Sequence, residues 1–178
     1  MFQTESFTNL LIEEPNRALK YLYDNLYNSL CNKTLSIVKD SNIAEDIVQE
    51  VIFDIWQKRE DIQIRTSIDA YIYRSCRNKA LNHLRAQKMN WEDDQQLFNF
   101  ESTITNVDLT LEADELQERI QNAISELPEK CGIIFSLSRF EGMSYQEISD
   151  SLEISIKTVE GQMSKALKIL REKFFHKI

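Results

Sequence analysis

The chain has 178 residues, of which 42% are hydrophobic and 28% charged, and its formal net charge is −8. This composition is that of a globular protein and excludes a disordered or fibrous chain, and the length fits one large or two small domains. Only three Gly and two Pro supply turn signals. Long segments with helical periodicity therefore predict an all-α fold of two small helical domains.

Several functional classes are disfavoured by what the sequence lacks. The first residues have neither the basic start nor the apolar run of a signal peptide, and no window holds the ~18 apolar residues of a membrane span. The three cysteines are widely spaced, without a CxxC or Cys/His cluster. We expect a cytoplasmic protein with free thiols, no direct membrane insertion and no metal. With no nucleophile–base set or phosphate-binding loop, we also expect no catalytic residue, cofactor, small-molecule substrate or enzymatic activity.

The negative charge is concentrated in one stretch. Residues 89–115 contain eight acidic residues and no Lys or Arg, whereas residues 1–88 contain twelve of each sign and residues 116–178 nine of each. This pattern predicts two domains, 1–88 and 116–178, joined by an acidic flexible linker at 89–115. An acidic chain ordinarily argues against nucleic-acid binding, but here the excess acid is confined to the linker.

The first domain is predicted to contain a helix from Pro15 and a second helix from about Asn42. Leucines at helical spacing predict that the first helix buries Leu19, Leu22, Leu26 and Leu30. Asn42 can cap the second helix, with Glu45 completing a capping box. The inner face of this second helix is predicted to comprise Ala44, Ile47, Val48, Val51, Ile52 and Ile55.

The outer face of the second helix is acidic and carries one aromatic residue. Residues 40–61 contain seven acidic and two basic residues. Phe53 among them is either a surface aromatic that packs on its own domain or an anchor for a basic protein partner. The candidate protein-binding residues are Asp46, Gln49, Glu50, Phe53, Asp54 and Gln57.

A third helix, from a cap at Thr66 to about Lys88, is basic, since residues 65–88 contain six basic residues and one acidic residue. Its buried side is predicted to be Ile72, Cys76, Ala80 and Leu84. A different side combines cations that neutralise phosphates, amides that read base edges and an aromatic ring that stacks on an unpaired base. A charged face turned to solvent is the alternative. The candidate nucleic-acid-binding residues are Tyr71, Arg74, Arg77, Asn78, Lys79, Asn82 and Arg85.

The second domain contains a helix over about 113–126, another from Leu127-Pro128, and then two capped helices. Ser144 and Glu147 form a capping box for a short helix, and Ser155 can cap the next one. A short helix, a three-residue turn and a second helix with a polar outer face are typical of a helix-turn-helix, with an ordinary helical hairpin as the alternative. The candidate base-reading residues, all expected to be exposed, are Lys157, Thr158, Glu160, Gln162, Ser164 and Lys165.

The last helix is predicted to expose a basic side and to bury Ile156, Val159, Met163, Ala166 or Leu167, and Leu170. Residues 157–178 contain six basic and two acidic residues. Gly161 lies in mid-helix, where it costs on the order of 1 kcal/mol relative to Ala. A close approach to the DNA backbone would account for this glycine.

Three segments in this order are similar to those of extracytoplasmic-function (ECF) sigma factors of the sigma-70 family. AEDIVQEVIFDIWQK (44–58) resembles the region 2 helix that docks on the β′ clamp helices of RNA polymerase. AYIYRSCRNKALNHLR (70–85) resembles the promoter-melting and −10 recognition segment. Residues 127–171 resemble region 4, whose helix-turn-helix reads the −35 element. Asn82 stands where many members have Asp, and Glu160-Gly161-Gln162 replaces a stretch often richer in Lys, Ser and Arg.

The resemblance implies a transcription initiation factor that binds core RNA polymerase and directs it to specific promoters, reading −10 with region 2 (1–88) and −35 with region 4 (116–178). It implies promoter DNA and an anti-sigma factor as further partners, and a monomer when free of partners. In the family the linker threads toward the polymerase active site. Its apolar residues either anchor it there or pack the two domains together; these are Trp91, Leu97, Phe98 and Phe100.

Two other functional classes fit less well. A stand-alone helix-turn-helix regulator with a sensing or dimerising first domain is disfavoured because residues 1–88 carry their own basic, aromatic face and lack a sustained heptad repeat. A protein-binding adaptor leaves both basic helices unexplained. A regulator would bind duplex DNA unaided, whereas a sigma factor of this kind usually needs core polymerase.

Overall fold

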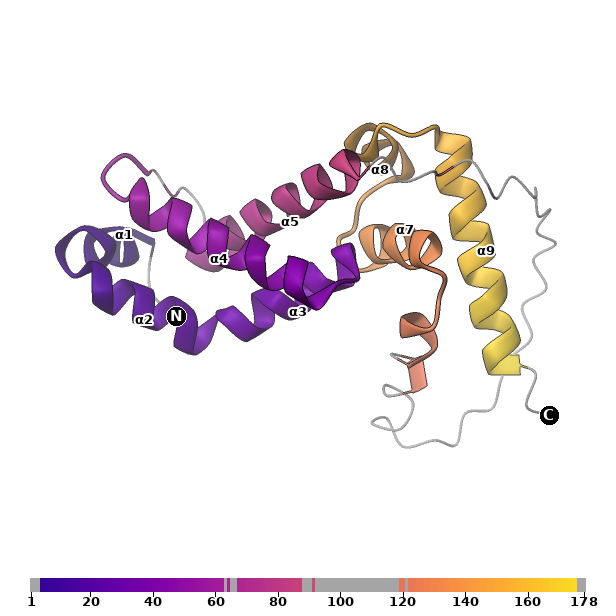
Figure 1. Cartoon of the computed structure of the whole chain (residues 1–178), viewed down its shortest axis with the longest axis horizontal. Coiled ribbons are helices and arrows are strands. Elements are labelled where there is room, and N and C mark those ends of the chain that lie inside the picture. Colours follow the sequence, from indigo (N-terminus) through magenta and orange to yellow (C-terminus); the bar gives the residue numbers. More distant parts are fainter. Residues whose placement is uncertain are drawn as a thin grey trace. The chain divides into compact units, whose positions relative to one another are not determined.

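The computed structural model describes residues 4–62, 64, 67–87, 91, 119–120 and 122–175. Within these ranges the regular elements are all α-helices, which confirms the predicted all-α fold (Figure 1). The chain divides into two compact units, Met1–Lys88 and Met89–Ile178. Apart from Trp91, which is buried, the predicted linker at 89–115 lies outside the described residues.

In its described residues the first unit contains helices α1 to α5, drawn from indigo to magenta in Figure 1. Helices α3, α4 and α5 pack against one another pairwise, and α2 packs against α1, α3 and α4. Its elements are α1 (Thr4–Glu13), α2 (Pro15–Asn25), α3 (Tyr27–Val38), α4 (Ser41–Gln57) and α5 (Ile68–Ala86).

The helix predicted from Pro15 is interrupted at Leu26, so that its leucine stripe is shared by α2 and α3. Leu22 and Leu30 are buried, whereas Leu19 and Leu26 are half-buried. The break changes the direction of the chain between two short helices. Periodicity alone missed the break because the leucine spacing continues across it.

Helix α4 begins earlier than predicted because Asp40, and not Asn42, is its cap. The Asp40 carboxylate accepts hydrogen bonds from the backbone N–H groups of Asn42 and Ile43 at 2.8 and 3.1 Å. Lys39 adopts a left-handed conformation, with φ of 60°, directly after α3. The connection is therefore only two residues long. The predicted inner face of α4 is confirmed, since all six of its residues are buried.

Helix α5 is capped by Ser67, whose hydroxyl accepts a hydrogen bond from the Ala70 N–H at 3.2 Å. The predicted cap, Thr66, lies outside the described residues. The buried side of α5 is confirmed: it contains the four predicted residues, together with Ile68 and Leu81.

The second unit is built on α7 (Glu129–Arg139), α8 (Tyr145–Leu152) and α9 (Ile156–Phe175), which pack pairwise. Of the helix predicted over about 113–126, residues 119–120 and 122–126 are described; all are helical except Glu126, which lies in a turn. One part of the core joins Leu127, Cys131 and Ala166, with partly buried neighbours Ile124, Phe135, Ile169 and Leu170.

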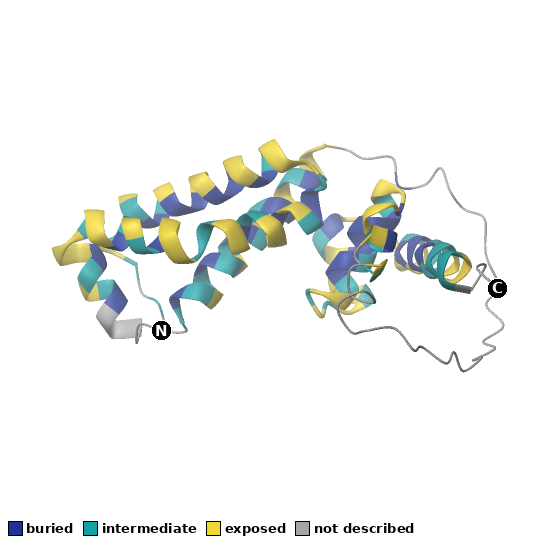
Figure 2. Cartoon of the chain, turned by 90° about the horizontal axis from the view of Figure 1, so that it is seen from below, coloured by how far each residue is buried: buried dark blue, intermediate teal, exposed yellow. Residues whose placement is uncertain are grey.

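In each unit the buried residues line the sides on which helices meet, and the outer sides are exposed (Figure 2). Val159, Met163 and Ala166 of α9 are buried as predicted, whereas Leu170 is only half-buried. Ile156 is 39% exposed, so its predicted burial is wrong: it is the first residue of α9 and lies at the end of the buried stripe. In the described part of the chain, no helix is long and apolar enough to span a membrane.

Candidate protein-binding and nucleic-acid-binding surfaces

The outer face of α4 forms an acidic surface with an exposed aromatic ring. Phe53 is 56% exposed, and its ring meets Trp56 at a centroid distance of 6.1 Å. This lateral contact leaves most of the ring open to a partner. Of the other predicted residues only Asp54 is half-buried, and the rest are exposed. We call this set the acidic surface: Asp46, Gln49, Glu50, Phe53, Asp54 and Gln57.

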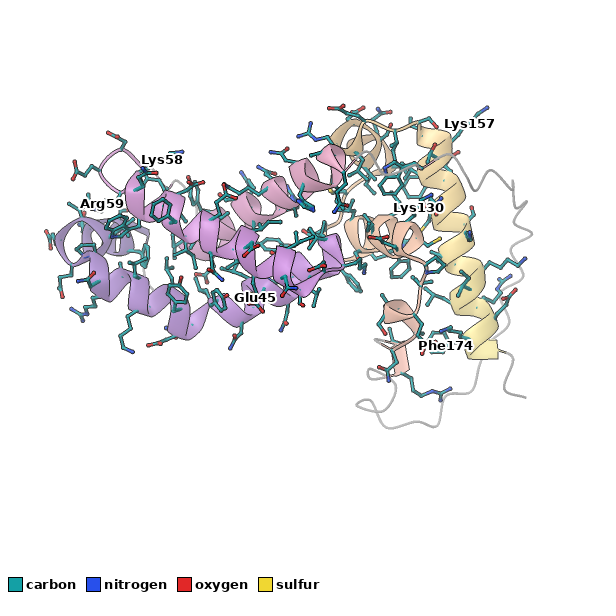
Figure 3. All side chains as sticks on the ribbon, viewed as in Figure 1. Glu45, Lys58, Arg59, Lys130, Lys157 and Phe174 are labelled. Atoms are coloured by element: carbon teal, nitrogen blue, oxygen red, sulfur yellow. The ribbon has the colours of Figure 1, made fainter. Side chains whose placement is uncertain are left out.

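Two residues that were not predicted, Trp56 and Arg59, lie beside the acidic surface. The guanidinium of Arg59 lies 5.0 Å from the centroid of the Trp56 ring and donates a hydrogen bond to the Trp56 carbonyl at 3.0 Å. Figure 3 shows Arg59 beside Lys58 at the end of α4. Trp56 thus contacts both the Phe53 ring and the Arg59 cation. The sequence prediction missed Trp56 and Arg59, although Phe53, Trp56 and Arg59 follow one another at three-residue spacing, which places neighbours on one side of a helix.

Gln49 connects the acidic surface to α3. Its side-chain amide donates a hydrogen bond to the Tyr27 hydroxyl at 3.3 Å. The Tyr27 ring in turn stacks on Tyr23, with centroids 5.2 Å apart. Burial raises the pKa of the Tyr27 phenol above its ordinary value, which keeps the hydroxyl neutral. Gln49 is therefore an exposed residue held by a neighbouring helix.

One candidate nucleic-acid-binding residue of α5 turns toward the acidic surface. The Lys79 ammonium lies 2.5 Å from Glu50 Oε1 and 2.9 Å from Asp54 Oδ2. Burial lowers the pKa of this ammonium, but its bonds to the two carboxylates outweigh burial and the pKa lies above its ordinary value. Lys79 is thus a charged link between α5 and α4.

The remaining candidates on α5 form a mixed stripe of cations, amides and one phenol. Arg74, Asn78, Asn82 and Arg85 are exposed, and the Arg85 guanidinium donates a hydrogen bond to the Asn82 side-chain carbonyl. Tyr71 and Arg77 are half-buried. The buried Nε of Arg77 has no hydrogen-bond partner among the described residues. We call these residues the basic stripe: Tyr71, Arg74, Arg77, Asn78, Asn82 and Arg85.

The predicted turn between α8 and α9 is confirmed at atomic detail. In the capping box of α8, the Glu147 N–H donates to Ser144 Oγ at 3.2 Å and the Ser144 N–H donates to Glu147 Oε2 at 2.8 Å. Glu153 ends α8 in a left-handed conformation, with φ of 58°. Ser155 Oγ then accepts a hydrogen bond from the Thr158 N–H at 3.0 Å. These bonds fix the direction in which α9 starts.

The start of α9 presents a short polar surface. Lys157 and Glu160 are exposed, and Figure 3 shows Lys157 at the first turn of the helix. Thr158 is half-buried, and its hydroxyl lies 2.8 Å from that of Ser155. Ser164 and Lys165 are half-buried. A side chain at Gly161 would meet no atom within 4 Å, so internal packing does not require glycine there.

The structure corrects the prediction that Gln162 is exposed and reads bases. It is only 3% exposed, and its Oε1 accepts a hydrogen bond from the Cys131 thiol of α7 at 3.1 Å. With Val159, Met163 and Ala166 it occupies positions i, i+3, i+4 and i+7, which face the core. The sequence contained this signal, but the polarity of glutamine suggested an outward position. Gln162 therefore cannot read bases without leaving the core.

Two further observations concern metal-ligating and thiol groups in the described part of the chain. No group of three His, Cys, Asp or Glu side chains there could hold a metal ion. Burial raises the pKa of the Cys76 thiol to about 12, so at neutral pH it is an unreactive core side chain. The described residues present three candidate surfaces: the acidic surface with its exposed ring, the basic stripe, and the polar start of α9.

Two family models match the chain, and they match different units. The model described as "Sigma-70 region 2" matches residues 22–89, and "Sigma-70, region 4" matches residues 117–170. The first match contains the acidic surface and the basic stripe. The second contains α7, α8 and the first three quarters of α9.

Characterised relatives match over most of their own length. The RNA polymerase sigma-H factor of Pseudomonas aeruginosa is 24% identical, over 92% of this chain and 91% of its own. SigZ of Bacillus subtilis, an RNA polymerase sigma factor, is 26% identical, over 85% and 84% of the two chains. The ECF RNA polymerase sigma-E factor of Escherichia coli K12 is 24% identical, over 92% of each.

Two solved structures are also similar. One is CnrH in complex with the cytosolic domain of CnrY, with a TM-score of 0.45, 19% identity and coverage of 97% of both chains. The other is the sigma factor RpoE in complex with the anti-sigma factor NepR from Bartonella quintana. It has the same TM-score and identity, and covers 92% of this chain and 99% of its own.

Proposed function

This chain belongs to the extracytoplasmic-function group of the sigma-70 family of RNA polymerase sigma factors, and we propose which of its surfaces bind polymerase and which bind promoter DNA. It is a transcription initiation factor that acts with RNA polymerase at specific promoters. We propose that it works by binding alone, without enzymatic activity of its own, in the cytoplasm.

The acidic surface is proposed to dock on basic residues of the β′ clamp helices of core polymerase. Phe53 supplies an exposed ring that a partner can bury, and burial of an aromatic anchor is the usual source of affinity at an interface. The surrounding carboxylates attract a basic partner and set its orientation. Trp56 and Arg59 extend this contact along α4, because they form one stack next to Phe53.

The basic stripe of α5 is proposed to hold the −10 region of the promoter as it opens. Unstacking bases costs a few kcal/mol, which phosphate contacts and stacking must offset. Arg74 and Arg85 are exposed for phosphates, and Asn78 and Asn82 for base edges. Tyr71, at one end of the stripe, supplies the stacking ring.

The first turns of α9 are proposed to read the −35 element in the major groove. The capped turn before α9 presents Lys157, Thr158 and Glu160 at its N-terminal end, as in other helix-turn-helix proteins. Ser164 and Lys165 lie farther along and are proposed to contact the DNA backbone. Gln162 is left out of this role because it belongs to the core.

The remaining parts of the proposal concern organisation and regulation. We propose residues 1–88 and 116–178 as the two functional domains and 89–115 as the linker between them. An anti-sigma factor is proposed as a regulatory partner, and the chain is proposed to be monomeric without partners. This organisation is supported by the match to two sigma factors, which covers more than nine tenths of this chain and of each relative.

One observation carries the proposal: α4 and α5, packed side by side, expose an acidic aromatic surface and a basic stripe. A protein that joins polymerase to DNA needs both. The test is to add purified chain to cognate core polymerase with a promoter from its own regulon. We expect promoter-specific transcripts that core alone does not make. Their absence, or strong binding of the chain alone to duplex promoter DNA, would favour a stand-alone regulator instead.

A further inference from the structure

Lys79 of α5 pairs with two carboxylates of the acidic surface of α4. Its ammonium bridges Glu50 and Asp54, which are one helical turn apart, at 2.5 and 2.9 Å. The Lys79 side chain is 28% exposed and that of Glu50 is 61% exposed. The ammonium is thus partly withdrawn from solvent, while the Glu50 carboxylate stays open to another protein. A polymerase cation that pairs with these carboxylates must share them with Lys79 or displace it.

We propose that Lys79 is an exchangeable internal cation, which neutralises part of the acidic surface in the unbound chain and is displaced by a basic residue of RNA polymerase on docking. The released ammonium then joins the basic stripe of α5 and contacts promoter phosphates. This inference rests on the proposed function, because it needs both polymerase docking and DNA binding by the same pair of helices.

The energetics allow such an exchange. Ion pairs at partly exposed sites are weak, at about 0.2–1 kcal/mol, so a competing cation can replace Lys79 without unfolding the unit. Helix α5 stays in place meanwhile, because Ile72, Cys76, Ala80 and Leu84 hold it in the core. One ammonium against two carboxylates also leaves a net negative charge, so the surface still attracts a basic partner.

The variant Lys79→Met separates exchange from a purely structural role. It keeps the aliphatic side chain and removes the charge, so loss of the internal competitor should tighten core binding by about two- to fivefold at low salt. The same variant should weaken opening of the −10 region by the holoenzyme. Core affinity is measured by titrating fluorescently labelled full-length chain, and opening by permanganate reactivity of promoter thymines. If Lys79 only positions the two carboxylates, core affinity falls as well.

Two controls isolate the charge exchange. Lys20→Met removes an equal charge from a lysine that pairs with Asp24 within α2, and should leave core affinity unchanged. In a Glu50→Gln, Asp54→Asn background, Lys79→Met should no longer tighten binding. Lys79→Arg, which retains the charge, should bind as the wild type does. Thermal unfolding of each variant shows that it is folded.

The outcomes distinguish this inference from the proposed function. Tighter core binding together with weaker promoter opening supports the exchange. Normal wild-type binding with unchanged or weaker binding of Lys79→Met overturns the exchange and leaves the proposed function standing. Failure of the wild type to bind core in the same titration overturns both.

Discussion

The two basic helices, α5 and α9, use their polar side chains differently. In α5 the predicted DNA-binding residue that pairs with another helix is a cation, Lys79, which lies between two carboxylates of α4. In α9 it is an amide, Gln162, which lies in the core and accepts a bond from Cys131. A surface ion pair can exchange partners at little cost, whereas a buried amide cannot. Each predicted DNA-binding set thus includes a residue that is held by another helix, Lys79 by α4 and Gln162 by α7, and of these two only Lys79 can also serve a partner.

Of the substitutions that test this contrast between Lys79 and Gln162, Gln162→Ala should cause the largest change in free energy. The substitution removes a buried hydrogen bond and leaves a cavity, so the free energy of unfolding should fall by about 1–3 kcal/mol, measured by chemical denaturation. Gln162→Met is the matched control: it fills the space, and because a thiol is a weak donor its loss of stability should be smaller. Equal stability of Gln162→Ala and wild type would show that the side chain is not in the core.

A smaller effect, on binding and not on stability, is expected from Phe53→Ala. Loss of an anchoring ring should weaken core affinity by about 1–2 kcal/mol, or roughly five- to thirtyfold, in a titration. Because the ring is 56% exposed, the free energy of unfolding should change by less than about 0.5 kcal/mol. Gln57→Ala, on the same surface without a ring, is the comparison variant. Unchanged core affinity of Phe53→Ala would return this residue to the role of a scattered surface aromatic.

Gly161→Ala should stabilise the second unit, by up to about 1 kcal/mol, because alanine favours the helix and its methyl group meets no atom within 4 Å. Thermal unfolding measures this gain. If the glycine allows close approach of DNA, output from promoters with an intact −35 element should fall although stability rises. Output that rises with stability would remove DNA approach as the reason for this glycine.

Lys157→Ala should have the smallest effect. The exposed ammonium makes no packing contribution, so stability should stay within about 0.5 kcal/mol of wild type. Loss of one phosphate or base contact should weaken holoenzyme binding and lower the salt dependence by about one counterion. The measurement is promoter affinity at several salt concentrations. An unchanged slope and affinity would place the DNA contact elsewhere on α9.

The helices and much of the core were predictable because they depend on local patterns. The apolar stripes of α4 and α5 and the capping box of Ser144 and Glu147 follow from spacing within single helices. The break at Leu26 was not predictable in this way, because an apolar period continues through a change of chain direction. The Asp40 cap depends on how tightly α3 and α4 are joined, which helical periodicity does not encode.

The candidate surfaces were predictable in outline but not in their pairings. Exposure of Phe53 and of most of the basic stripe followed from which face of each helix is polar. The ion pairs of Lys79 join residues from two helices, so no pattern within either helix reveals them. Gln162 shows the reverse case: its spacing pointed to the core, and only its polarity pointed outward.

The central claim is that α5 and α9 contact different promoter elements, and site-specific photo-crosslinking in a holoenzyme–promoter complex tests it most directly. A photoreactive residue in place of Asn78 should crosslink to the −10 region, and one in place of Lys157 to the −35 region. The acidic surface should stay on polymerase, so a probe at Gln57 should label β′ and no DNA. If the photoreactive residues at positions 78 and 157 crosslinked to the same promoter element, or if neither crosslinked to DNA, the claim that α5 and α9 contact different elements would be contradicted.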